Sequence, residues 1–150
     1  MLMCTYMECK LHTSLSLTGP PGASVGGAHY VHWGNSTCPD TEGTVMLYSG
    51  VAAATHFNDQ GGGSNYLCLH EEPEFLDTTP GIQEFRARVY GTEYETINSP
   101  FESLHNHNVP CSACHTSARG DVIMIPGKVN CPDSWTREYY GYLMAEYNHV

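Results

Sequence analysis

Apolar and polar residues alternate in short runs along most of the chain, and turn-forming residues separate the runs. In a β-strand successive side chains face opposite sides of the sheet, so runs of this kind indicate strands. Seven segments fit the pattern, at 29–33, 44–48, 52–57, 65–70, 85–90, 121–125 and 139–145. No stretch of helical length shows a helical period. The pattern therefore predicts an all-β fold, sandwich- or barrel-like, with antiparallel strands and long loops.

The first 25 residues do not follow this pattern. We expect 1–25 to form an irregular N-terminal segment and 26–150 to form a single β-rich domain. Residues 19–24 have the sequence GPPGAS, which equals two collagen triplets. A turn-rich linker explains the same residues, and the residues alone favour the linker. The start is not a clear signal peptide, because its basic residue, Lys10, is not followed by a continuous apolar run.

The chain contains an internal repeat. The tripeptide Cys-Pro-Asp occurs at 38–40 and again at 131–133, and each copy is followed by a Tyr-x-Gly-x-x-x-Ala motif, at 48–54 and 139–145. The matched order favours a duplication over chance and predicts two related halves. The second copy ends before any equivalent of the segment 65–70, so we expect the domain to be incomplete at its C-terminus.

Charge narrows the range of partners. Only 15% of the residues are charged and the formal net charge is -10. An acidic surface repels phosphate backbones and anionic lipids, so we expect no nucleic-acid partner. No run of membrane-spanning length is apolar, so we also expect no membrane insertion. Solubility explains the acidity most simply, since no calcium-binding loop motif accompanies it.

Cysteine usage indicates an oxidising compartment. Five of the seven cysteines lie in the expected domain and are disulfide candidates, namely Cys38, Cys68, Cys111, Cys114 and Cys131. Asn35 begins an Asn-Ser-Thr glycosylation sequon. Together these features predict an extracellular, secreted glycoprotein. We expect Cys38 to pair with Cys68, and Cys131 to pair with Cys111 or Cys114, although spacing alone leaves the connectivity open.

Two imidazoles and two thiols lie close together near the middle of the second half. His105, His107, Cys111 and Cys114 form a ligand set that zinc takes tetrahedrally. The alternative is a surface loop with disulfide-bonded cysteines, and an oxidising compartment favours it. We therefore expect no cofactor, and zinc remains the alternative.

A polar loop in the first half offers a candidate ligand site. His56, Asn58, Asp59, Asn65 and Tyr66 surround a triple glycine. Amides and carboxylates bind sugar hydroxyls, and an aromatic ring stacks on the apolar face of a sugar. A flexible hairpin loop without a ligand is the simpler interpretation. No G-x-S-x-G nucleophile motif occurs, and we expect no enzymatic activity.

Seven motifs taken together resemble one family. They are GGAHYVHWGNSTCP at 26–39, YSG at 48–50, GGGSNYLCL at 61–69, VYGTEYE at 89–95, HNHNVPC at 105–111, VIMIP at 122–126 and GYLMA at 141–145. Residues 26–150 are similar in these motifs to the C-terminal non-collagenous domain of the short-chain collagens of sponges and other invertebrates.

The resemblance implies a function. Relatives of this kind carry the domain after a Gly-X-Y segment, are matrix or secreted proteins, continue beyond this endpoint with further cysteines, and include some described as carbohydrate-binding. The resemblance therefore implies that 19–24 is a collagen remnant and that the chain is a non-catalytic structural or interaction module of the extracellular matrix. Its expected partners are matrix proteins or glycans, with a second copy of the chain in a homo-oligomer as a further possible partner. The alternative function is a secreted, lectin-like carbohydrate-binding protein.

Overall fold

The computed structural model describes residues 4–11, 26–56, 65–76, 78–82, 84 and 88–145, and for residues 4–11 it describes the backbone alone. The described residues form antiparallel strands and one 3-10 turn, η1 (Glu102–Leu104). The strands are β1 (Cys4–Leu11), β2 (Ala28–Trp33), β3 (Thr44–Ala54), β4 (Leu67–His70), β5 (Tyr90–Gly91), β6 (Pro110–Thr116), β7 (Val122–Pro126) and β8 (Trp135–Leu143). The prediction of an all-β fold is confirmed.

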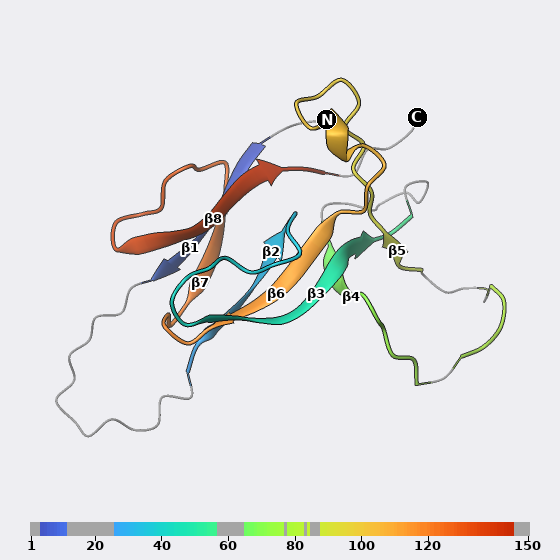
Figure 1. Cartoon of the computed structure of the whole chain (residues 1–150), viewed down its shortest axis with the longest axis horizontal. Coiled ribbons are helices and arrows are strands. Elements are labelled where there is room, and N and C mark those ends of the chain that lie inside the picture. The colour runs from blue at the N-terminus through green and yellow to red at the C-terminus, as the bar shows by residue number, and fades with distance from the viewer. Residues whose placement is uncertain are drawn as a thin grey trace.

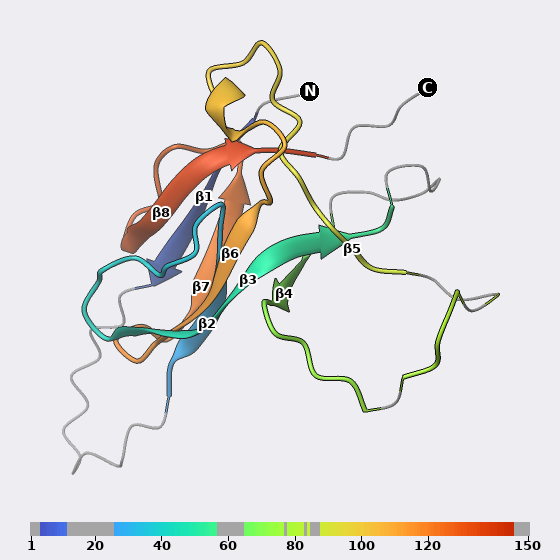
Figure 2. The ribbon, with the colours of Figure 1, turned by 45° about the vertical axis from the view of Figure 1, so that its right-hand side comes forward.

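The strands form two antiparallel sheets (Figure 1). One sheet has the order β7-β1-β8, and the other has the order β2-β6-β3-β4 with β5 also paired to β3. Neighbours within each sheet are distant in sequence, since β6 lies between β2 and β3 and β1 lies between β7 and β8. Figure 2 shows the strands of the smaller sheet beside β2 and β6 of the larger one. The arrangement is a sandwich, as the alternating pattern predicts.

A small core lies between the sheets. Its buried members are Tyr30 on β2, Cys114 on β6 and Tyr139 on β8. Partly buried apolar side chains surround this cluster, namely Trp33, Cys38, Val122, Met124 and Leu143. The rings of Tyr30 and Tyr139 are stacked with their centroids 6.3 Å apart. Among the side chains that the structure describes, two aromatic rings and one half-cystine form the buried part of the contact between the layers.

Two predicted strands are one in the structure. The pattern predicts separate strands at 44–48 and 52–57, but β3 continues through the residues between them. Gly50 is buried, and a Cβ atom there would collide with the backbone carbonyl of Leu69 on β4. The glycine allows two strands to approach closely and does not mark a turn.

The expectation that 1–25 is irregular is wrong for Cys4–Leu11. These residues form β1, which is the central strand of the three-stranded sheet. Their mixture of charged and apolar residues gives no clean alternation, and their partners β7 and β8 lie more than a hundred residues away. The GPPGAS segment lies outside the described residues. In sequence it falls between β1 and β2.

The segment after β4 differs from the sheets. It extends away from them (Figures 1 and 2), and Phe75, Leu76 and Ile82 are 73%, 103% and 73% exposed. The predicted strand at 85–90 is reduced to its last residue, Tyr90, in β5. Residues 85–87 lie outside the described part of the chain.

Candidate functional site

Two disulfides cross the larger sheet on either side of β6. Cys38 bonds to Cys114 with a Cα–Cα distance of 5.9 Å, and Cys68 bonds to Cys111 with a Cα–Cα distance of 5.8 Å. Both β6 half-cystines are fully buried. The expected pairing of Cys38 with Cys68 is therefore wrong. Cys131 is also disulfide-bonded, but neither Cys111 nor Cys114 is its partner, because both are already bonded.

The position of Cys111 and Cys114 on a strand explains this connectivity. Residues three apart on a strand face opposite sides of the sheet. Cys114 faces the core, where its Sγ lies 3.8 Å from the Ser112 hydroxyl oxygen. Cys111 bonds instead to β4, which lies on the far side of β3 in the same sheet. The predicted strands do not include 110–116, so the spacing of the two cysteines alone does not separate their sulfurs.

The proposed zinc ligands are not brought together. Cys111 and Cys114 are consumed in different disulfides, which removes the thiolates that zinc requires. His105 follows η1, and its Nδ1 lies 3.7 Å from the Glu95 carboxylate. His107 is exposed, and its carbonyl accepts the backbone N–H of Tyr94. No group of three or more metal-ligating side chains occurs among the residues that the structure describes.

A polar network lies where the two sheets meet. The Glu138 carboxylate on β8 accepts hydrogen bonds from the Tyr30 hydroxyl at 2.6 Å and from the Thr41 hydroxyl at 2.8 Å. The hydroxyl of Tyr139 donates to the carbonyl of Val31 at 2.6 Å. A carboxylate that accepts two hydroxyl donors is held firmly, so the network fixes how β8 lies on β2.

His32 extends this network toward the surface. Its ring lies 4.3 Å from the Tyr139 ring, and its Nδ1 lies 2.7 Å from the Thr37 carbonyl, to which it donates. Burial lowers the pKa of His32 below 6.5, while the Thr37 carbonyl and the charge of Glu138 oppose that shift. The imidazole is therefore held neutral at pH 7.

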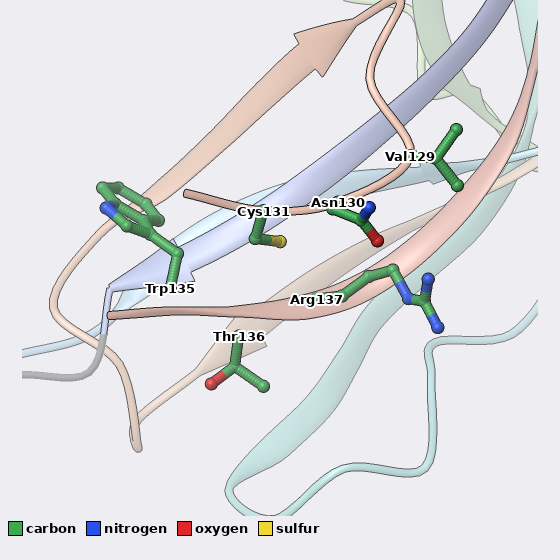
Figure 3. A pocket seen from close by; sticks show the side chains of 6 residues that line it. All are labelled: Val129, Asn130, Cys131, Trp135, Thr136 and Arg137. Carbon is green, nitrogen blue, oxygen red and sulfur yellow. The ribbon is translucent and has the colours of Figure 1, made fainter. Parts of the chain in front are cut away.

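A hollow of about 460 Å³ lies at the start of β8. Val129, Asn130, Cys131, Trp135, Thr136 and Arg137 line it. Figure 3 shows the Trp135 ring and the Arg137 side chain on β8, with Cys131 and Asn130 on the preceding loop. The Arg137 guanidinium also lies 4.9 Å from the centre of the Tyr140 ring. An indole, an amide and a guanidinium in one hollow can bind a polar ligand with an apolar face.

The predicted sugar loop is only partly described. Asn58 and Asp59 lie outside the described residues. The His56 ring lies 4.6 Å from the Tyr90 ring in an edge-to-face arrangement, and Tyr66 is half-buried while Asn65 is exposed. A ligand site at these loop residues therefore stays a prediction.

The glycosylation sequon lies in a tight surface turn. The Asn35 side-chain oxygen accepts hydrogen bonds from both the backbone N–H and the hydroxyl of Thr37, each at 3.1 Å. Asn35, Ser36 and Thr37 are all exposed. The turn leaves the Asn35 amide nitrogen accessible for modification, which remains a prediction.

Sequence reasoning missed Glu138, Tyr30 and Trp135. Glu138 lies between Arg137 and Tyr139 in an apparently ordinary strand, and nothing in its neighbours signals a buried role. The repeat was the one available signal, because alignment of the two halves makes β8 the counterpart of β3. That alignment identifies the strand but not the partner of its carboxylate.

No family model matches the chain, and no solved structure matches it. In the part of the chain that the structure describes, no helix has the length and apolar character needed to cross a bilayer. The arrangement of strands and disulfides is therefore the basis for a functional proposal.

Proposed function

We propose that the chain is a non-catalytic structural or interaction module of the extracellular matrix. The observation that carries the proposal is the pair of disulfides that attach β6 to the loop after β2 and to β4, with both β6 half-cystines buried. Disulfides persist in secreted and cell-surface proteins and are rare where thiols are kept reduced. A domain with a small core gains much of its stability from such bonds, so it depends on an oxidising compartment.

An exposed apolar segment supports the interaction role. Val45, Met46 and Leu47 on β3 are 54%, 51% and 54% exposed. Among the described residues, β4 and β5 pair with β3 from Gly50 to Ala54. The outer edge of β3 at Val45, Met46 and Leu47 is therefore not paired with either strand. An edge strand with exposed apolar side chains favours pairing with an extended segment of a partner, and matrix proteins are the expected partners.

Retention in a matrix tests this proposal. The chain, secreted by cultured animal cells, is applied to a cell-free matrix layer, and the retained fraction is measured before and after a salt wash. We expect retention by the wild type and at least a several-fold loss in a variant with Met46→Lys and Leu47→Ser. Phe75→Ser, which changes an exposed residue away from β3, is the matched control and should be retained. Equal loss of the wild type, the β3 variant and Phe75→Ser in the wash would contradict the proposal.

The second candidate is a secreted carbohydrate-binding protein, and the hollow beside Trp135 favours it. An indole ring provides a stacking surface for a sugar, and Asn130 and Arg137 supply hydrogen-bond donors. A glycan array with the wild type and Trp135→Ala tests it. Binding that is lost in Trp135→Ala and kept in Phe75→Ala supports a lectin, and no binding to any glycan rules it out.

A further inference from the structure

The two halves of the chain exchange their first strands. In sequence, β1, β2 and β3 form one half, and β6, β7 and β8 form the other. In space, β6 of the second half lies between β2 and β3, while β1 of the first half lies between β7 and β8. Each three-stranded unit therefore consists of two strands from one half and the first strand of the other (Figure 1).

The two central strands, β6 and β1, pair with β3 and β8 in equivalent registers. Cys114 on β6 is opposite Met46, and the next pair, Ala113 and Tyr48, skips Leu47. On β1, Cys9 is opposite Arg137, and the next pair, Glu8 and Tyr139, skips Glu138. The single-residue bulge falls at the same place in both units.

The tyrosines that follow these bulges are equivalent. Tyr48 and Tyr139 each begin the Tyr-x-Gly-x-x-x-Ala motif of the sequence repeat. In this alignment Cys9 occupies the position of Cys114.

The registers on the other side agree as well. On the larger sheet Cys114 is opposite Tyr30 of β2, and on the smaller sheet Cys9 is opposite Ile123 of β7. Tyr30 and Ile123 each lie on the second strand of their own half, eight positions before the cysteine of its Cys-Pro-Asp tripeptide. Both neighbours of the central strand therefore give the same equivalence between Cys9 and Cys114.

The Cys-Pro-Asp tripeptides complete the comparison. Cys38 opens the first tripeptide and bonds to Cys114. Cys131 opens the second tripeptide and is also disulfide-bonded. From the shared register we infer that Cys9 is the partner of Cys131, so that both units are closed by the same covalent clamp.

Cys4 does not fit as the partner. Disulfide bonding requires Cα atoms roughly 4.4–6.8 Å apart. Cys4 is opposite Leu143, near the end of β8, whereas Cys131 precedes the first residue of β8, Trp135. Cys4 and Cys9 are five positions apart in β1, which corresponds to about 16 Å along a strand. Cys9, opposite Arg137, lies at the correct end of the strand.

The clamp gives β1 a covalent attachment to the smaller sheet. Residues 12–27 are the chain connection between β1 and β2, and among the described contacts β1 is held by its backbone ladders to β7 and β8. Forming the bond removes one hydrogen from each thiol, and a small-molecule disulfide accepts the two electrons and two protons and is reduced to two thiols. Cys4 remains as a thiol within the chain.

Peptide mapping without reduction tests the inference. The secreted monomer is denatured in an alkylating reagent and cleaved with cyanogen bromide, which separates Cys4 from Cys9 at Met7. We expect the fragment that contains Cys131 to be linked to the fragment that begins at Glu8, and Cys4 to be alkylated. A link from Cys131 to the short fragment with Cys4 would overturn the inference, as would a link that joins two copies of the chain.

Two variants keep the test decisive. Cys4→Ser should leave the fragment linked to Cys131 unchanged and abolish alkylation of the wild-type thiol. Cys9→Ser should abolish the link between the Glu8 and Cys131 fragments. If Cys9→Ser is not secreted, the Cys4→Ser map still decides, because loss of the Cys131 link in that variant contradicts the assignment.

Discussion

The two units of the sandwich share one plan, but only one of them is covered on its outer edge. In the larger sheet β3 carries β4 and β5 beyond the central β6, and four residues of β6 are fully buried. In the smaller sheet β8 is the edge strand among the described residues, and Tyr140 and Tyr142 on it are 64% and 50% exposed. The two units therefore share three strands and, among the described residues, differ in the strands that pair beyond them.

The largest difference should follow removal of the clamp in the larger sheet. Replacing Cys38 and Cys114 together by Ala removes a disulfide that closes a loop of 76 residues. We expect the free energy of unfolding to fall by about 4 kcal/mol, because a long loop regains its entropy in the unfolded chain. Denaturant unfolding measures the change. Replacing Cys68 and Cys111, which are 43 residues apart, should cost slightly less; the opposite order would contradict the loop-entropy account.

A glycine pair distinguishes the covered edge from the open one. Gly50 and Gly141 are equivalent in the repeat, but only Gly50 faces a neighbouring strand on its outer side among the described residues. Gly50→Ala should lower the free energy of unfolding by about 1–3 kcal/mol, because the new methyl group collides with the Leu69 carbonyl. Gly141→Ala should cost much less. Equal losses in thermal or denaturant unfolding would show that β8 is also covered.

The contact between the sheets should have a smaller effect. Tyr139→Phe removes the hydroxyl that donates to the Val31 carbonyl and leaves that acceptor without this partner. We expect a loss of about 1 kcal/mol in the free energy of unfolding. Tyr140→Phe, on the exposed side of the same strand, is the control and should change stability little. If the two variants unfold alike, the hydrogen bond does not join the sheets.

The smallest expected effect is on how the free energy of unfolding depends on pH. Burial lowers the pKa of His32 in the folded state, so the unfolded chain binds the proton more readily. The contribution of His32 to stability is complete above pH 6.5 and is lost as the pH falls from 6.5 through the lower folded pKa. His32→Asn can keep a donor for Thr37 but does not titrate. The difference in unfolding free energy between pH 7.5 and pH 5 should therefore shrink in this variant, and an unchanged difference would exclude His32 as a cause.

The fold class could be predicted from the sequence. Most of the strands that come second or third in their half of the chain could be predicted as well. The strands β2, β7 and β8 begin or end near their predicted limits because their alternation is regular and turns flank them. Both first strands, β1 and β6, were missed. Each is the central strand of its unit, and its partners come from the other half of the chain, so local alternation carries little information about it.

The candidate site was predictable only in its residue types. The cysteines were correctly expected to form disulfides, but their pairing depends on which faces of β6 the two sulfurs occupy. The polar network around Glu138 and the hollow beside Trp135 depend on how β8 lies against β2 and on the loop before it. The hydrogen bonds of Glu138 join residues about a hundred positions apart, and spacing does not reveal them.

The central claim is that the chain is an oxidised module of the extracellular space. Its most direct test is the intact mass of the protein secreted from cultured cells, measured after alkylation with and without prior reduction and again after enzymatic removal of N-glycans. We predict that one of the seven cysteines is alkylated before reduction and that all seven are alkylated afterwards, with a glycan mass that disappears in Asn35→Gln. Alkylation of all seven cysteines without reduction, in a chain that remains inside the cell, would contradict the account.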